Sequence, residues 1–99
     1  MALPKDVLRA MSRYPAFSQR VWKECAKIPK GKTLTYGEIA RRLGKPGAAR
    51  AVGQALGANP FAPTVPCHRV VAANGLGGFS APGGVKAKAR LLRRERAIL

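Results

Sequence analysis

Two neighbouring side chains, Cys67 and His68, are of the types that carry out nucleophilic chemistry. His68 is the only histidine of the chain, and it follows one of only two cysteines. A thiol becomes a strong nucleophile when a neighbouring base or cation favours its ionised form. On an extended segment adjacent residues point to opposite faces, so we expect a bridging water to carry the proton between them. The pair predicts a reactive cysteine, although by itself such a pair is more often structural than catalytic.

A histidine that accepts a proton needs a third group that orients the ring and stabilises its cation. The chain has only four acidic residues, and Glu95 on a predicted C-terminal helix is the candidate for this role. The alternative is that Glu95 merely balances the arginines beside it. With one histidine and no Cys-x-x-Cys pair, we expect no metal and no cofactor.

The elements that must position these residues are predicted to be mostly helical. Apolar residues recur at helical spacing after Ser18, a good N-cap, and Pro29 ends this pattern. The other cysteine, Cys25, falls on this apolar stripe and is expected to be a buried small hydrophobe. Thr35 and Glu38 have the spacing of a capping box, which marks the start of the next helix.

A further helix is predicted over residues 48–56, after a turn that contains Gly44 and Gly47. Two short helices joined in this way indicate a helix-turn-helix. Residues 67–71 are predicted to be extended, with a hairpin turn at Asn74 and Gly75 and a basic last helix from about Val85. We therefore expect a single domain over 1–99, mostly α with a small β-hairpin, built on a winged-helix-like helix-turn-helix.

The charge balance points to a polyanionic partner. The formal net charge is +15, from 19 lysines and arginines against four acidic residues. Self-repulsion on this scale favours nucleic-acid binding, while an RNA-binding protein of the ribosomal type or a merely arginine-rich surface are the alternatives. The sequence shows neither a signal peptide nor a membrane span, so we expect a cytoplasmic protein. We also expect it to be a monomer.

Residues 65–71, which read Val-Pro-Cys-His-Arg-Val-Val, resemble the active-site motif of the O6-alkylguanine-DNA alkyltransferases. Other segments look like landmarks of the same family, in family order and spacing: Thr-Tyr-Gly-Glu-Ile-Ala at 35–40, Ala-Arg-Ala-Val-Gly at 49–53, Asn-Pro at 59–60, and Leu-Leu followed by Glu at 91–95. The resemblance covers residues 16–96, which makes it far more specific than any single motif.

The resemblance implies roles for several residues. Cys67 would accept the alkyl group from guanine O6 in one irreversible displacement, with His68 as its base through water and Glu95 completing the relay. Tyr36 would help to rotate the target nucleotide and would donate a hydrogen bond to the leaving guanine. Arg50 would fill the gap left in the base stack.

The same resemblance implies a structural setting for this chemistry. The helix that carries Arg50 would enter the minor groove of double-stranded DNA, where its small and polar residues allow close approach: Ala49, Gly53 and Gln54. Asn59 would brace the turn that leads to the active-site segment. The pocket would be lined or supported by Pro66, Arg69, Val70 and Ser80.

Two departures from the family pattern leave an alternative open. Typical members carry an additional N-terminal domain, whereas the single-domain alkyltransferase-like proteins bind the lesion and recruit nucleotide excision repair without transferring the alkyl group. Those proteins commonly replace the acceptor by tryptophan, and Cys67 therefore favours transfer. The loop over residues 79–84 looks closer to the alkyltransferase-like group, and it borders the expected pocket. The third hypothesis is that the chain is a general basic DNA- or RNA-binding module.

Overall fold

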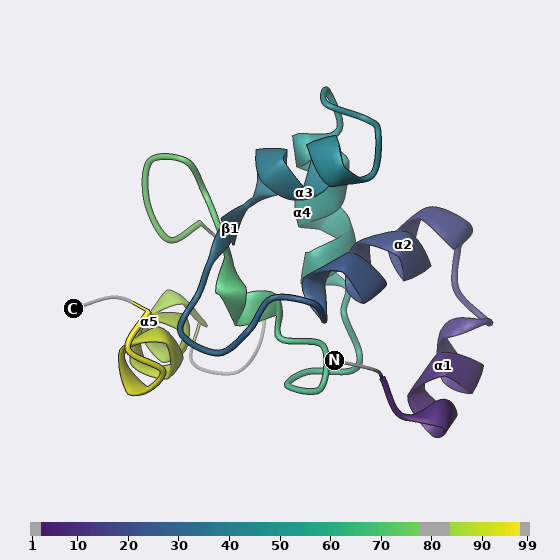
Figure 1. Ribbon diagram of the computed structural model, residues 1–99, viewed down its shortest axis with the longest axis horizontal. Helices are drawn as coiled ribbons and strands as arrows, with labels where there is room; N and C mark the ends of the chain where they lie inside the picture. Colours follow the sequence, from purple (N-terminus) through teal and green to yellow (C-terminus); the bar gives the residue numbers. More distant parts are fainter. Residues whose placement is uncertain (1–2, 78–83, 98–99) are drawn as a thin grey trace.

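The computed structural model describes residues 3–77 and 84–97 (Figure 1). In these residues the helices are α1 (Lys5–Met11), α2 (Ala16–Cys25), α3 (Tyr36–Arg42), α4 (Ala49–Gly57), α5 (Gly84–Arg94) and the short 3₁₀ helix η1 (Cys67–Arg69). Two strands, β1 (Leu34–Thr35) and β2 (Val70–Val71), complete the elements. The predicted fold class, mostly helical with a small β element on a helix-turn-helix, is confirmed.

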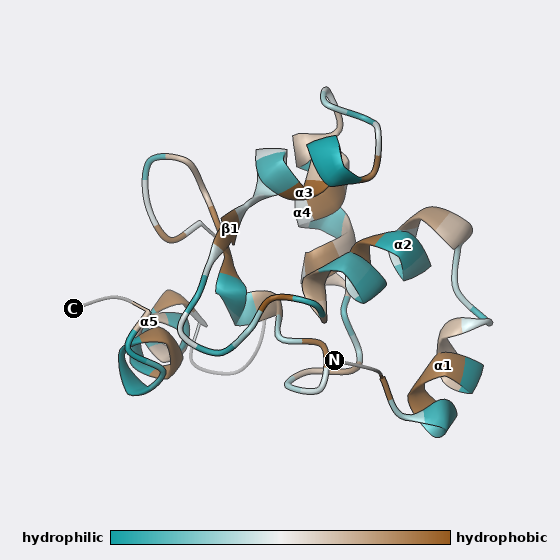
Figure 2. Ribbon diagram, in the orientation of Figure 1, coloured by the Kyte–Doolittle hydropathy of each residue, from teal (hydrophilic) through white to brown (hydrophobic). Residues whose placement is uncertain are grey.

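Helix α2 is the central helix of the core. It begins at Ala16 after Pro15, and not at the predicted cap Ser18, because the fixed φ of proline suits the residue that starts a helix. Val21, Trp22 and Cys25 are buried as the apolar stripe predicts, and the Trp22 indole donates a hydrogen bond of 2.9 Å to the Ala55 carbonyl of α4. Figure 2 shows teal and brown segments along α2, as expected for a helix with one apolar face.

Helices α3 and α4 pack against each other and against α2. The predicted capping box is present at the start of α3: the Glu38 amide donates to Thr35 Oγ1 at 3.1 Å, and the Thr35 amide donates to Glu38 Oε1 at 2.9 Å. The turn between the helices contains Gly44 at φ +75°, a conformation that glycine adopts without strain.

The two strands of the described residues form a parallel pair, which the sequence did not predict. Leu34 lies opposite Val70 and Thr35 lies opposite Val71. A parallel pair needs a long crossover, and helices α3 and α4 form it here. The predicted turn at Asn74 and Gly75 closes an antiparallel bridge between Ala72 and Gly75. The return of the predicted hairpin falls mainly on residues 78–80, which lie outside the described residues.

The segment with the reactive pair is also not extended at its start. Cys67, His68 and Arg69 form the 3₁₀ turn η1, which follows Pro66 and leads directly into β2. Side chains in such a turn are spaced by about a third of a turn and do not alternate between two faces. Because η1 leads directly into β2, the pairing of Val70 and Val71 with β1 fixes where this turn lies.

Candidate active site

The two cysteines have different environments. Cys25 is fully buried, and its burial raises the pKa of that thiol to about 12, so that it stays protonated. Cys67 is half-buried on η1 and packs against the edge of the hydrophobic core. Of the two thiols, only Cys67 is placed where a ligand can reach it.

His68 is buried next to Cys67 and contacts a carboxylate. It is 4% exposed, and its Nε2 lies 3.0 Å from Oε2 of Glu95, which follows the last turn of α5. An ionised carboxylate can only accept hydrogen bonds, so Nε2 carries the proton and Nδ1 is the acceptor nitrogen of the neutral ring. The contact with Glu95 therefore favours the tautomer in which Nδ1 is the nitrogen that can accept a proton.

Glu95 accepts from a second residue of the same turn. The Arg69 guanidinium donates from Nε to Oε1 at 2.9 Å and from Nη2 to Oε2 at 2.8 Å. These hydrogen bonds from Arg69, with a smaller effect of His68, lower the pKa of Glu95 from 4.5 to about 2. Glu95 is consequently a carboxylate at neutral pH.

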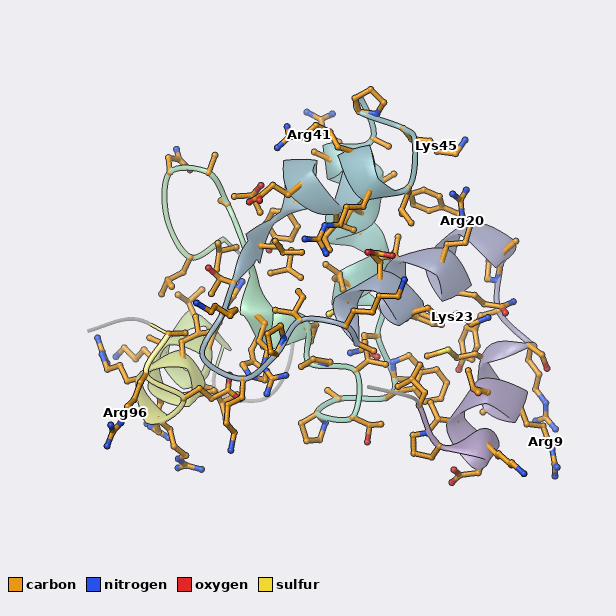
Figure 3. The ribbon with its side chains drawn as sticks, viewed as in Figure 1. Arg9, Arg20, Lys23, Arg41, Lys45 and Arg96 are labelled. Carbon is orange, nitrogen blue, oxygen red and sulfur yellow. The ribbon has the colours of Figure 1, made fainter. Side chains whose placement is uncertain are left out.

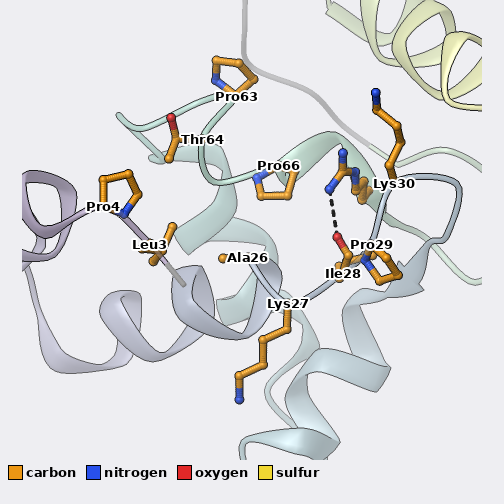
Figure 4. A pocket seen from close by; sticks show the side chains of 11 residues that line it. Leu3, Pro4, Ala26, Lys27, Ile28, Pro29, Lys30, Pro63, Thr64 and Pro66 are labelled. Carbon is orange, nitrogen blue, oxygen red and sulfur yellow. Dashed lines mark hydrogen bonds between the residues drawn. The ribbon is translucent and has the colours of Figure 1, made fainter. Parts of the chain in front are cut away.

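Arg69 also connects the site to the end of α2. Its Nη1 donates a hydrogen bond of 2.8 Å to the carbonyl of Ile28, shown as the dashed line in Figure 4. One side chain thus connects η1, the residue after α5 and the segment after α2.

Tyr36 begins α3 directly after β1, and its ring is held between glycines. A Cβ atom added to Gly53 of α4 would lie 3.9 Å from the ring, and one added to Gly77 would lie 2.7 Å from the Tyr36 hydroxyl oxygen. Gly77 is therefore required where the chain passes close to this hydroxyl group.

Lys88 also lies in this region, although the sequence predicted it to be one of the exposed basic residues of the last helix. Its side chain is fully buried, and its ammonium nitrogen lies 3.5 Å from the Tyr36 hydroxyl oxygen and 5.7 Å from the ring centroid. The signal was available, because Lys88 and Leu92 are about one turn apart on one face of α5, and Glu95 follows three residues later, just after the helix ends. Leu92 and Glu95 were expected on the inner face.

Other predicted site residues lie around η1. Asn59 donates from Nδ2 to the Val65 carbonyl at 3.0 Å and accepts from the Phe61 amide at 2.8 Å, so it connects the end of α4 to the segment before the site. Pro66 and Val70 are buried on either side of η1. Ser80 lies outside the described residues.

The predicted DNA-facing residues are on α4. Arg50 and Gln54 are exposed, Ala49 and Gly53 are half-buried, and the buried residues of the helix face α2 and α3. Cationic side chains cover several elements of the surface, with Arg41 and Lys45 near the turn between α3 and α4, as Figure 3 shows.

A cavity of about 750 Å³ lies beside the site but does not contain it. It is lined by residues from the N-terminal segment, the end of α2 and the 63–69 segment, among them Leu3, Ile28, Thr64 and Arg69 (Figure 4). Neither Cys67 nor Tyr36 lines it. In the described part of the chain, no helix is long and apolar enough to cross a bilayer, and no cluster of three or more potential metal ligands occurs.

Comparison with known proteins gives one consistent family. Residues 16–97 match the family model of the 6-O-methylguanine DNA methyltransferase, DNA binding domain. The methylated-DNA–protein-cysteine methyltransferase of Mycobacterium tuberculosis is 55% identical over 82 residues, which are 82% of this chain and 48% of that protein. The Salmonella typhimurium protein of the same name is 47% identical over 95 residues, which are 95% of this chain and 54% of that protein. The chain thus spans about half the length of these relatives.

Solved structures agree with this result. The crystal structure of Mycobacterium tuberculosis OGT in complex with DNA superimposes with a TM-score of 0.80 at 52% identity, over 86% of this chain and 51% of that chain. The structure of Schizosaccharomyces pombe Atl1 in complex with damaged DNA containing O6-carboxymethylguanine gives a TM-score of 0.66 at 36% identity, over 80% of this chain and 74% of that chain.

Proposed function

The chain belongs to the family of the 6-O-methylguanine DNA methyltransferase DNA-binding domain, and we propose that it repairs DNA by moving an alkyl group from guanine O6 to Cys67. The observation that carries this proposal is the site on η1. There the accessible thiol of Cys67 is followed by a histidine whose ring is oriented by a carboxylate 3.0 Å away. This is the arrangement that activates a sulfur nucleophile.

The transfer is a single displacement at the alkyl carbon. The bond from Cys67 Sγ to that carbon forms as the bond from carbon to O6 breaks, and the electron pair of the broken bond stays with the guanine. The thiol proton passes through water to Nδ1 of His68. The leaving guanine takes up one proton through the hydrogen bond from the Tyr36 hydroxyl, which regains a proton from water. No cofactor takes part in these steps, and the product is an S-alkylcysteine.

Glu95 acts on the base and not on the substrate. It keeps His68 in the tautomer with the proton on Nε2 and stabilises the imidazolium that forms, while Arg69 keeps the carboxylate ionised. Pro66 and Val70 hold the turn, and Asn59 holds the segment that leads to it.

A guanine inside a duplex hides its O6 atom, so the target nucleotide must leave the base stack. We assign this step to α4 and to Tyr36. Arg50, exposed on α4, enters the gap, and Ala49, Gly53 and Gln54 lie along the helix that approaches the minor groove. The net charge of +15 supplies attraction to phosphates that does not depend on base sequence.

The direct test is incubation of the chain with a duplex that contains one O6-methylguanine, followed by intact-mass measurement. A gain of one methyl group per chain is the expected result. Selective binding of the lesion duplex without mass gain would instead indicate a lesion-sensing protein that recruits nucleotide excision repair. Equal binding of damaged and undamaged duplex would indicate a general nucleic-acid-binding module, and either of these results would overturn the proposal.

A further inference from the structure

The positive charge of the chain is not concentrated on the helix that the proposed function assigns to the minor groove. Helix α4 contains a single cationic residue, Arg50. On α5, by contrast, Lys86, Arg90 and Arg94 are exposed and follow one another at intervals of four residues, so they form one stripe along the helix. The buried residues of α5 lie on its other side, where the helix packs against η1. The outer side of α5 is therefore a second cationic surface.

This surface continues onto a neighbouring loop at the C-terminal end of α5. A Cβ atom added to Gly31 would lie 3.4 Å from the carbonyl oxygen of Glu95, so the loop is packed against the residue that follows the helix. Lys30 and Lys32, on either side of Gly31, are exposed. Arg96 is also exposed and has φ +61°, a conformation in which glycine or asparagine is the usual residue. These side chains together make up the α5 patch: Lys30, Lys32, Lys86, Arg90, Arg94 and Arg96.

None of the four acidic residues of the sequence, all of which are described, forms an ion pair with the α5 patch. Glu95 accepts hydrogen bonds from η1, Glu38 belongs to the capping box of α3, and Asp6 is on α1. Glu24 pairs with two cations that are not part of the patch. Like charges four residues apart on a helix repel each other, so the stripe destabilises α5 unless an anion binds there.

The α5 patch and the helix-turn-helix lie at different ends of the molecule. In Figure 3, Arg96 lies at the lower left, whereas Arg41 and Lys45, near the turn between α3 and α4, lie at the top. A projection can shorten the distance between two points but cannot lengthen it, so this separation is real. The chain therefore presents cations to two separate partners or to two separate parts of one partner.

We propose that the α5 patch binds the phosphate backbone of a second DNA segment while α4 holds the first, so that one chain bridges two duplexes. The inference rests on the proposed function only for the placement of the first duplex on α4.

The dimensions and side-chain types of the patch match a duplex backbone. From Lys86 to Arg94 the stripe spans about 12 Å, at 1.5 Å per residue. A duplex carries one negative charge per about 1.7 Å of its axis, so about seven phosphates lie along that length. The patch has no aromatic side chain on which unpaired bases could stack, and this favours a duplex over a single strand. Binding through phosphates alone depends on salt and depends neither on base sequence nor on the lesion.

The test measures whether one chain holds two duplexes at once. An undamaged biotinylated duplex is fixed to beads in excess over the chain, so that each fixed duplex holds at most one chain. A fluorescent undamaged duplex is then added, and its capture is measured at several salt concentrations. A second label on the chain gives the number of chains per captured duplex.

Two charge-matched variants are compared with the wild type. The patch variant replaces three exposed cations of α5 by glutamine: Lys86→Gln, Arg90→Gln and Arg94→Gln. The control variant removes the same charges, at the same spacing, from exposed residues in and just after α1: Lys5→Gln, Arg9→Gln and Arg13→Gln. Urea unfolding should show that both variants are folded, because none of these side chains is buried.

We expect the wild type and the control variant to capture the fluorescent duplex with one chain per captured duplex. For the patch variant the affinity of capture should fall by about tenfold or more, and the salt slope should become shallower by about 2.7, for three lost phosphate contacts. With a single short O6-methylguanine duplex, the patch variant and the control variant should bind equally well. At saturating duplex they should transfer the methyl group at equal rates.

Equal capture by the patch variant and the control variant would overturn the inference. Two chains per captured duplex would also overturn it, because two copies and not one chain would then form the bridge. A wild-type chain that transfers the methyl group but captures no second duplex would overturn the inference and leave the proposed function intact. Capture that depends on the α5 patch, in a chain that gains no methyl group, would support the inference and contradict the proposed function alone.

Discussion

Glu95 is the acidic group on which the geometry of the site depends. Its carboxylate accepts two hydrogen bonds from Arg69 and one from His68, and its side chain is 9% exposed. Opposite charges that are shielded from water in this way contribute more to stability than an exposed pair does.

We predict that Glu95→Gln lowers the free energy of unfolding at neutral pH by about 1.5–3 kcal/mol, the range for a hydrogen bond to a charged group. The folded-state pKa of Glu95 is lowered from 4.5 to about 2, so the ionised group stabilises the fold above pH 4.5 and this stabilisation is lost as the pH falls toward 2. Urea unfolding at several pH values should show the gap between wild type and variant closing over that range.

The control for this prediction is Glu24→Gln. Glu24 pairs with Lys27 and Arg42, whose side chains are 63% and 50% exposed, so its loss should cost at most about 1 kcal/mol. Equal destabilisation by the two substitutions would contradict the special position of Glu95.

At the residue scale the sequence indicated the candidate pair Cys67 and His68 more readily than the side chains that hold the pair in place. The adjacency of Cys67 and His68 can be read directly, and Glu95 followed from the scarcity of acidic residues and from the family resemblance. The bidentate contact of Arg69 with Glu95 depends on how α5 docks on η1, which no local pattern contains. Lys88 was missed because a lysine in a basic helix was taken as exposed, although its spacing from Leu92 indicated the inner face.

At the scale of elements, the close approach of the 72–77 segment to α3 fixes Tyr36. Gly77 has φ +74°, and a Cβ atom there would meet the Tyr36 hydroxyl oxygen at 2.7 Å and the Ala72 amide nitrogen at 3.2 Å. We predict that Gly77→Ala lowers the free energy of unfolding by about 1–3 kcal/mol and slows methyl transfer, because Tyr36 must move.

Gly75→Ala is the matched control, since no described residue lies within 4 Å of a Cβ atom at Gly75. Chemical unfolding and single-turnover transfer should be measured on both variants. A Gly77→Ala chain as stable and as fast as Gly75→Ala would show that the position of Tyr36 is not constrained by this segment.

Helix α4 should determine the preference for the lesion. We predict that Arg50→Ala weakens binding to the O6-methylguanine duplex by about 1–3 kcal/mol, because the gap in the base stack is no longer filled. Arg9→Ala removes the same charge from α1, which lies far from α4 in Figure 1, and should cost less. Equal losses in fluorescence titrations would remove the assignment of Arg50.

Local signals predicted helices α2 to α5 and the extended residues Val70 and Val71, but neither helix α1 nor the pairing of the strands. The capping box of Thr35 and Glu38 and the apolar stripe of α2 act within a few residues, so a sequence pattern reveals them. The parallel pairing of Leu34 with Val70 joins segments that are far apart in sequence, and neither two-residue strand has a pattern of its own. The turn at Asn74 and Gly75 suggested a hairpin, and no local pattern indicated the parallel crossover between β1 and β2.

For the whole molecule, the net charge of +15 predicts an affinity for DNA that depends strongly on salt. Each phosphate that a lysine or arginine neutralises releases counterions, so the logarithm of the binding constant falls by about 0.9 per phosphate for each tenfold rise in salt. Titrations of damaged and undamaged duplexes at several salt concentrations should give similar slopes and a preserved preference for the lesion. A preference that vanishes as salt rises would mean that charge alone produces it.

In the proposed reaction the alkyl group moves to the accessible thiol of η1. This transfer is tested most directly by reacting the chain with an O6-methylguanine duplex, digesting the product and locating the added methyl group by tandem mass spectrometry. We expect one methyl group on Cys67, none on buried Cys25, and none anywhere after Cys67→Ser. A methyl group on Cys25, or an unmodified chain beside a consumed lesion, would contradict the proposed transfer.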